Sequence, residues 1–190
     1  MSQLELLKKV VDTLDEAGIE YMLTGAMVSA AQGVPRLTHD IDVVVDLREN
    51  DAGSLLNAFK QPDYYLSEES IRQGLADRGS FNLVEPSTGN KVDFWLLTDE
   101  PFDRSRFSRR YREEFRGVGL EVSSPEDTIL MKLKWADELG GSEKQFIDAL
   151  RVYELQFEVI EQEYLSTWAE HLGISRSLDR VRTEAKPVRG

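Results

Sequence analysis

Two aspartates one residue apart open an apolar segment of the chain. Asp40 and Asp42 stand in "PRLTHDIDVVVD", directly before a run of valines. Side chains on a strand alternate between its faces, so both carboxylates would project from one face while Ile41, Val43 and Val45 fill the other. Carboxylates held this close repel unless a positive charge lies between them, and a divalent metal such as Mg²⁺ suits that place. The alternative is an acidic pair that merely begins a strand at a solvent-exposed edge.

Two further features flank this pair along the chain. Upstream, "YMLT" leads into Gly25 and the start of a helix, where free backbone N–H groups and the helix dipole favour a phosphate. Downstream, "KVDFWLL" places Asp93 inside an apolar strand, where an unpaired charge would be costly. If that strand lies beside the first one, Asp93 becomes the third member of a carboxylate cluster.

The elements that must position these residues are of mixed type in the first half of the chain. Apolar positions recur at helical spacing up to Gly18, which is placed to end the first helix. The segment "PSTGN" suits a tight connection, which predicts a hairpin between the strands on either side of it. The pattern predicts strands at 19–24, 41–47, 80–85 and 91–98, and further helices at 26–33, 51–60 and 68–77.

The second half of the chain has helical patterns only. Ser124 and Asp127 predict an N-terminal cap, and Ser142 with Gln145 predicts a capping box before the next helix. A last amphipathic helix ends before Gly173. The expected organisation is an α/β core over 1–123, a helical segment packed on it over 124–173, and a flexible tail over 174–190.

The order of a strand, Gly plus a small residue, a short helix, a D-x-D strand and a later strand aspartate resembles the nucleotidyltransferase superfamily with the DNA polymerase beta-like fold. The stretches "YMLTGAMVSAAQGVPRLTHDIDVVV" and "SPEDTILMKLKWADELGGSEKQFIDALRVY" look like motifs of the abortive-infection (AbiEii-type) nucleotidyltransferase toxins and their relatives. The resemblance implies an α/β fold: a mixed sheet flanked by helices, followed by a C-terminal helical segment.

The resemblance also implies roles for individual residues. Asp40 and Asp42 would ligate two Mg²⁺ ions, and Asp93 would complete the second site and accept the proton of the acceptor hydroxyl. Gly25 and Ala26 occupy the family's Gly-Ser or Gly-Gly position, which contacts the nucleotide phosphates. Ala26 has no hydroxyl, so only its backbone can make that contact.

Three further charged residues have two interpretations each. Lys132 and Asp148 match the lysine and aspartate that relatives place near the nucleotide. Alternatively, Lys132 lies at the surface and Asp148 pairs locally with Lys144 or Arg151 at helical spacing. Arg36, just before the D-x-D strand, is either a phosphate contact or a surface loop charge.

The histidines and tryptophans are expected to be structural. His39 would point to the face opposite Asp40, and His171 lies late in a helix, where a cation suits the dipole. Trp95, Trp135 and Trp168 fall on apolar stripes, which indicates core positions rather than a base-stacking platform.

Composition limits the classes of function. The chain has 190 residues, a net charge of −12 and no cysteine, which excludes disulfides and thiolate metal sites and disfavours broad binding to a polyanion. No apolar run approaches the roughly 18 residues that a membrane span needs, so a soluble, cytoplasmic protein is expected.

The resemblance implies a Mg²⁺-dependent enzyme that moves a nucleoside monophosphate from a nucleoside triphosphate to an acceptor hydroxyl. The acceptor could be a protein, an RNA such as tRNA, or a small molecule, and the enzyme could be a toxin with an antitoxin partner. One alternative is a noncatalytic nucleotide-binding or antitoxin-like module of the same fold. Another is a protein that binds an acidic partner such as tRNA through the arginines of 103–116 and the tail; those arginines could equally be solvated surface charges.

Overall fold

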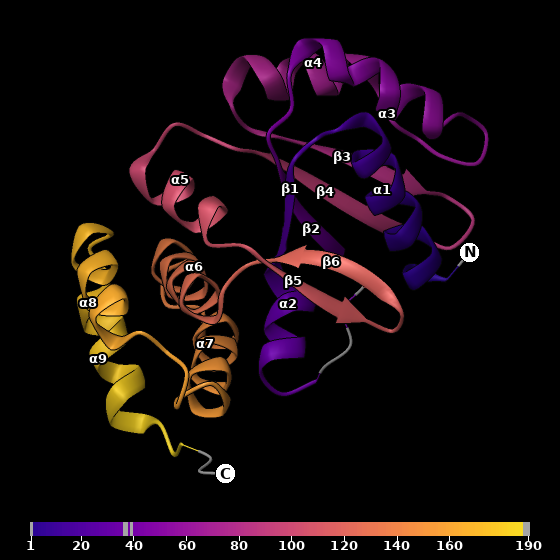
Figure 1. Ribbon diagram of the computed structural model, residues 1–190. Coiled ribbons are helices and arrows are strands. Elements are labelled where there is room, and N and C mark those ends of the chain that lie inside the picture. Colours follow the sequence, from indigo (N-terminus) through magenta and orange to yellow (C-terminus); the bar gives the residue numbers. More distant parts are fainter. Residues whose placement is uncertain (1, 36–37, 39, 188–190) are drawn as a thin grey trace. The chain divides into compact units, whose positions relative to one another are not determined.

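The computed structural model describes residues 2–35, 38 and 40–187. The described chain divides into two compact units. The sheet unit covers 2–24, 38 and 40–122, and the helical unit covers 25–35 and 123–187. The division after Val122 lies next to the boundary expected from the sequence, but the helix that follows the first strand belongs to the helical unit. This helix is α2 (Gly25–Gln32), labelled in Figure 1.

The sheet unit is built on one mixed sheet whose strands are ordered β3-β4-β2-β1-β6-β5. The pairs β2–β4 and β1–β6 are parallel, and the other neighbours are antiparallel. The hairpin predicted at "PSTGN" is the antiparallel pair β3–β4. The strands are β1 (Tyr21–Thr24), β2 (Asp40–Val45), β3 (Ser80–Glu85), β4 (Asn90–Leu96), β5 (Tyr111–Phe115) and β6 (Val118–Val122).

Two helices of the sheet unit agree closely with the sequence, at the end of α1 and over the whole of α4. Ser2 and Glu5 form a capping box at the start of α1, and Gly18 ends that helix in the left-handed conformation with φ of 65°. The helix predicted over 68–77 is α4. The helical elements of this unit are α1 (Gln3–Ala17), η1 (Glu49–Asp51), α3 (Ala52–Ala58), α4 (Glu68–Asp77) and α5 (Pro101–Ser108).

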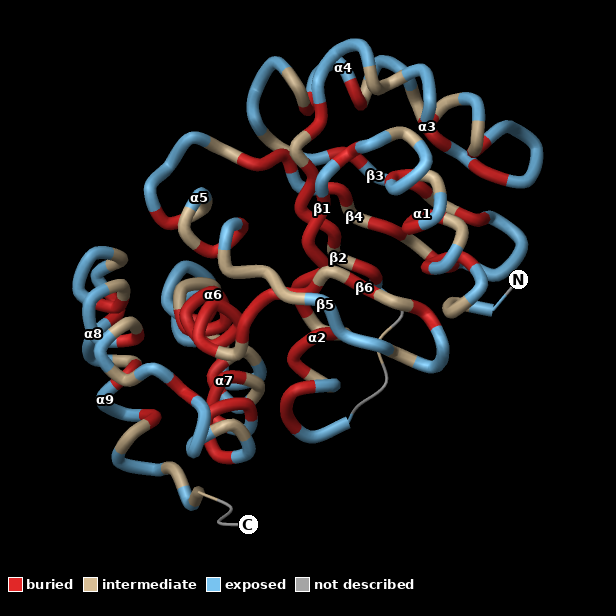
Figure 2. Tube along the Cα trace, in the orientation of Figure 1, coloured by how far each residue is buried: buried red, intermediate tan, exposed pale blue. Residues whose placement is uncertain are grey.

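The two faces of β2 differ in character. Ile41, Val43 and Val45 are buried on one face, as the alternation of side chains predicted. The other face carries Asp40 and Asp42, and further along the strand it becomes apolar. There a buried cluster forms from Met22, Val44, Leu97 and Phe107, the last of them on α5. Figure 2 shows β1 and the end of β2 buried.

The helical unit contains α2 in addition to the helices of the second half of the chain. Contacts join α2 to α6 and α7, and the side chain of Gln156 donates a hydrogen bond of 2.9 Å to the backbone carbonyl of Gln32. A side chain at Gly33 would meet the backbone oxygen of Ser29 at 2.8 Å, so this close approach requires glycine. The helices are α2 (Gly25–Gln32), α6 (Pro125–Glu138), α7 (Glu143–Leu155), α8 (Gln162–His171) and α9 (Ser175–Glu184).

Two expectations for the helical unit differ from the structure. The segment 174–190, expected as a flexible tail, contains α9, which buries Leu178 and Val181 against its neighbours α7 and α8. Ser142 is the residue before α7, but its side chain makes no capping hydrogen bond. Gln145, its expected capping-box partner, accepts a hydrogen bond from the ammonium of Lys132 instead.

The arginine-rich segment 103–116 contains most of α5 and all of β5, neither of which the sequence predicted. Its arginines make ion pairs within the sheet unit, including Arg106 with Asp103 and Arg110 with Glu20. Arg112 lies 3.6 Å from a carboxylate oxygen of β6. These pairings favour the interpretation as structural and surface charges over a nucleic-acid-binding patch.

Candidate functional site

The aspartates of the two motifs meet on one face of the sheet. In the parallel pair β2–β4, Asp42 is the partner of Asp93 and Asp40 is the partner of Lys91. Partners in register on neighbouring strands point to the same side, and such strands lie about 4.8 Å apart. We call this side of β2 and β4 the carboxylate face. The condition set by the sequence, that the later strand lies beside the D-x-D strand, is fulfilled.

Asp93 is held by two donors from its surroundings. One carboxylate oxygen lies 2.8 Å from the ammonium of Lys91, and the other accepts a hydrogen bond of 2.7 Å from the side chain of Asn82 on β3. Its side chain is 15% exposed, against 36% for Lys91. The carboxylate that looked costly inside an apolar strand is therefore neutralised and hydrogen-bonded.

Lys91 interacts with every member of the cluster. Its hydrogen bond to Asp93 is the largest cause that raises the pKa of its ammonium, and the negative charges of Asp93, Asp40 and Asp42 add to this effect. Lys91 was not among the residues expected in the site. The signal was present, because Lys91 lies two residues before Asp93 and must share its face.

Trp95 lies on the carboxylate face as well. Its side chain follows Asp93 by two residues, and its indole Nε1 donates a hydrogen bond of 3.3 Å to Asp42. The residue is 40% exposed, so the expectation that Trp95 is a core residue is wrong. Trp135 and Trp168 are half-buried in the helical unit.

The carboxylate oxygens of this face have the right chemistry for a hard divalent cation, since Mg²⁺ prefers oxygen ligands. Among the residues that the structure describes, no three side chains of His, Cys, Asp or Glu converge in a metal-binding group. The two oxygens of Asp93 face Lys91 and Asn82. The face thus bears three carboxylates, the type of group that ligates Mg²⁺, and a lysine neutralises them.

The expected phosphate-binding residues lie in the helical unit. Gly25 begins α2 with a positive φ of 73°, a conformation that glycine adopts without strain. Ala26 follows in the first turn, and its carbonyl accepts a hydrogen bond from the hydroxyl of Ser29. Arg36 and His39 lie outside the described residues.

Lys132 and Asp148 form a buried ion pair within the helical unit. Their charged atoms are 3.0 Å apart, and the side chains are 3% and 11% exposed. Lys132 on α6 is therefore not a surface residue, and it pairs with Asp148 on α7. The pair joins two helices, which gives both residues a structural role whatever else they do.

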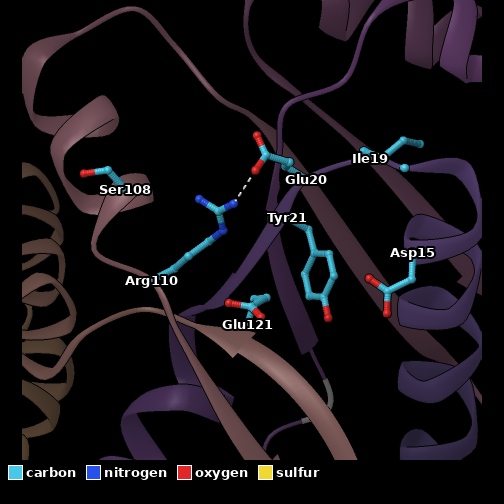
Figure 3. A pocket seen from close by; sticks show the side chains of 8 residues that line it. Asp15, Ile19, Glu20, Tyr21, Ser108, Arg110 and Glu121 are labelled. Carbon is cyan, nitrogen blue, oxygen red and sulfur yellow. Dashed lines mark hydrogen bonds and ion pairs between the residues drawn. The ribbon is translucent and has the colours of Figure 1, made fainter.

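A separate cavity lies around the start of β1 (Figure 3). It has a volume of about 490 Å³, and Asp15, Glu121 and an ion pair of Arg110 with Glu20 line it. Tyr21 is 2% exposed, and its hydroxyl has no hydrogen-bond partner in the described structure. Burial, followed by the charge of Asp15, raises the pKa of Tyr21 to about 12, while the nearby backbone of Glu121 acts in the opposite direction.

The chain has a nucleotidyltransferase-like fold: two solved structures match nearly all of it, and one of them is described as nucleotidyltransferase-like. The antibiotic-resistance factor ANT(2'')-Ia, in complex with adenylyl-2''-tobramycin, is 20% identical, covers 96% of this chain and 99% of its own, and has a TM-score of 0.55. An antigenic nucleotidyltransferase-like protein from Paracoccidioides brasiliensis is 16% identical, with coverages of 98% and 94% and a TM-score of 0.51. No protein-family model and no curated protein matches the sequence.

Proposed function

We propose that this protein is a metal-dependent nucleotidyltransferase, which moves a nucleoside monophosphate from a nucleoside triphosphate to an acceptor hydroxyl. The observation that carries the proposal is the register of β2 and β4, which brings Asp93 beside Asp42 on the face that also bears Asp40. The fold supports it, because a solved structure described as nucleotidyltransferase-like has the same fold. No helix among the described residues is long and apolar enough to cross a membrane. A cytoplasmic location is proposed from the substrate, because nucleoside triphosphates are found there.

In the proposed reaction, an acceptor oxygen attacks the α-phosphate in line with the departing pyrophosphate. Asp40 and Asp42 would hold two Mg²⁺ ions, and Asp93 would complete the second site. Two metal ions in such a site stabilise the attacking and the leaving oxygen. Asp93 accepts the proton of the acceptor hydroxyl as the new P–O bond forms and the bond to the pyrophosphate oxygen breaks.

The remaining roles concern the nucleotide. Gly25 and Ala26 are proposed to contact the phosphates through backbone N–H groups, which suits the positive φ of Gly25 at the start of a helix. Arg36 is proposed as a further phosphate contact. Lys132 and Asp148 are proposed to act near the nucleotide chiefly by fixing α6 to α7, because each already faces the other.

A second candidate function is a noncatalytic nucleotide-binding or antitoxin-like module. The observation that favours it is the engagement of both oxygens of Asp93 by Lys91 and Asn82, together with Ala26 in place of a hydroxyl residue. In that case a nucleotide would bind without being consumed. Titration calorimetry with and without Mg²⁺ distinguishes the two, because only the enzyme requires the metal for nucleotide binding and turnover.

The acceptor is proposed to be a small molecule, a protein or an RNA such as tRNA. One structural neighbour, ANT(2'')-Ia, was solved in complex with adenylyl-2''-tobramycin, which makes a hydroxylated small molecule the first acceptor to test. If the acceptor is a protein or an RNA, we propose that the enzyme is a toxin related to the AbiEii type. Such a toxin would have an antitoxin partner.

The deciding experiment incubates the protein with Mg²⁺ and each α-labelled nucleoside triphosphate in the presence of a cell extract, purified tRNA or tobramycin. Transfer of label to one of these acceptors by the wild type, and not by an Asp40→Ala, Asp42→Ala double variant, supports the proposal. Equal labelling by both proteins, or none with any triphosphate and acceptor, contradicts it.

A further inference from the structure

Lys91 occupies the place that positive charge must fill on the carboxylate face. It is the register partner of Asp40, and its ammonium lies 2.8 Å from Asp93, which is itself the partner of Asp42. Like charges directly opposite on neighbouring strands destabilise a sheet. Three carboxylates share this face, and the partner that Asp93 has on its other side, Asn82, is neutral.

We propose that Lys91 is a built-in counter-cation, which neutralises the carboxylate face in the metal-free protein and competes with the divalent metal for it. The inference rests on the proposed function for the identity of the metal, but its first consequence, the stabilisation of the metal-free fold, does not. In the metal-free protein Lys91 is a positioning residue, because there it acts on Asp93 and its neighbours.

Competition follows from the geometry. An ammonium at hydrogen-bond distance from Asp93 repels a second cation at the same carboxylate, and the repulsion is strongest where little water intervenes. Asp93 is 15% exposed, so screening of this repulsion is incomplete. A metal can use the oxygen that faces Lys91 only after the ammonium moves, and the 36% exposure of the lysine side chain leaves it room to do so.

The displaced ammonium also has a consequence for the nucleotide. Lys91 is tethered to β4 beside the face, so a lysine that leaves Asp93 remains close to any triphosphate bound there with the metal. Metal and nucleotide should therefore bind with positive coupling that depends on Lys91, and by linkage each should strengthen the other by the same factor.

The test compares the wild type with Lys91→Met and Lys91→Arg, and uses Lys8→Met as the matched control. Lys8 also ion-pairs with an aspartate, Asp12, at 2.6 Å, but on the exposed surface of α1. The metal-free proteins are melted, and Mg²⁺ and Mn²⁺ are titrated by calorimetry without nucleotide and with a nonhydrolysable triphosphate.

Lys91→Met is expected to lower the melting temperature of the metal-free protein by about 2–4 °C. It should also tighten metal binding about 10-fold and reduce the coupling between metal and nucleotide. Lys91→Arg keeps the charge and should behave like the wild type, and Lys8→Met should leave metal affinity unchanged. If Lys91→Met does not fold, Lys91→Gln removes the charge while keeping a donor for Asp93.

Metal affinity that is unchanged or weaker in Lys91→Met overturns the inference. The outcome is separable from that of the proposed function. If the wild type transfers no nucleotide but Lys91→Met binds metal more tightly, the inference stands and the enzymatic proposal fails. If transfer is observed and the metal affinities are equal, the inference alone fails.

Discussion

Asp42 and Asp93 are direct partners across a parallel pair of strands, although they lie in distant parts of the chain. The pairing makes a single carboxylate testable. Asp42→Asn removes the charge at nearly constant volume, and it should reduce nucleotide transfer at least about 100-fold, because stabilisation by metal ions contributes several kcal/mol. Transfer of α-label measures the effect, and Asp12→Asn on the exposed side of α1 is the control. Transfer at the wild-type rate by Asp42→Asn ends the proposed mechanism.

The fluorescence of Trp95 should report cation binding at the carboxylate face. Because its indole N–H donates to Asp42, a cation that binds this carboxylate should change the fluorescence of Trp95. Trp95→Phe removes the donor and keeps the ring, so the metal-induced change should disappear. Stability should fall by no more than about 1 kcal/mol, since one hydrogen bond of an exposed side chain is lost. A metal-induced change that survives in Trp95→Phe would assign the signal to the tryptophans of the helical unit.

The ion pair of Lys132 and Asp148 distinguishes a structural role from a nucleotide contact. Removal of one partner from a buried pair leaves an uncompensated charge, so Lys132→Met should destabilise the protein by about 3–5 kcal/mol in chemical denaturation. Asp148→Asn should have a similar effect, and the double variant should cost less than the sum of the two. A variant of normal stability that no longer binds nucleotide would instead favour direct contact.

The packing of α9 predicts that residues 175–184 are part of the folded helical unit. Leu178 is 1% exposed, so Leu178→Ala should reduce the free energy of unfolding by about 2–5 kcal/mol. Thr183→Ala, on the exposed side of the same helix, should change it by no more than about 0.5 kcal/mol. Equal effects of the two substitutions would contradict the packing of α9.

Tyr21 predicts a specific loss of stability in alkali. Its pKa is raised from the ordinary value of 10 to about 12, so the folded protein retains a proton that the unfolded chain releases. The contribution of the protonated Tyr21 to the free energy of unfolding is therefore complete below pH 10 and is lost as the pH rises to about 12. It amounts to about 2 to 3 kcal/mol. Tyr21→Phe should flatten this part of the stability profile.

At neutral pH the same substitution should be neutral or stabilising. It removes a buried hydroxyl that has no partner in the described structure, and the apolar ring remains. Urea denaturation at pH 7 and pH 11 measures both effects. An identical alkaline slope in the two proteins would contradict the account of Tyr21.

The parts of the fold that could be predicted are those with a clear local pattern. The alternation along β2 and the turn residues between β3 and β4 indicated the strands and their hairpin, and Gly18 marked the end of α1. Asp93 could be placed beside Asp42 only on the condition that β4 joins β2, because no local pattern states which strands pair.

The parts that escaped prediction lack such patterns. Strand β5 has the sequence "YREEF", where an edge strand exposes charged residues and no apolar alternation exists. In α9 the two buried residues, Leu178 and Val181, lie among charged ones, and such a sequence is typical of a solvated tail. The side chain of Gln145 bonds to Lys132 on another helix, and the capping hydrogen bond expected at Ser142 is absent. The sequence did not predict this contact, because a contact between distant segments leaves no pattern among neighbouring residues.

The parallel pairing of β2 with β4 also sets an order of events in folding. The hairpin β3–β4 joins neighbouring segments and can assemble Asn82, Lys91 and Asp93 early, with the lysine already beside its aspartate. Asp40 and Asp42 join only after the chain closes a loop that includes α3 and α4, and nonlocal parallel pairing of this kind is slow. We therefore expect nascent or partly unfolded molecules to hold Asp93 already neutralised by Lys91, before Asp40 and Asp42 join them to complete the acidic array. The complete array is a property of the mature molecule, and its appearance in a refolding experiment should coincide with the last kinetic phase.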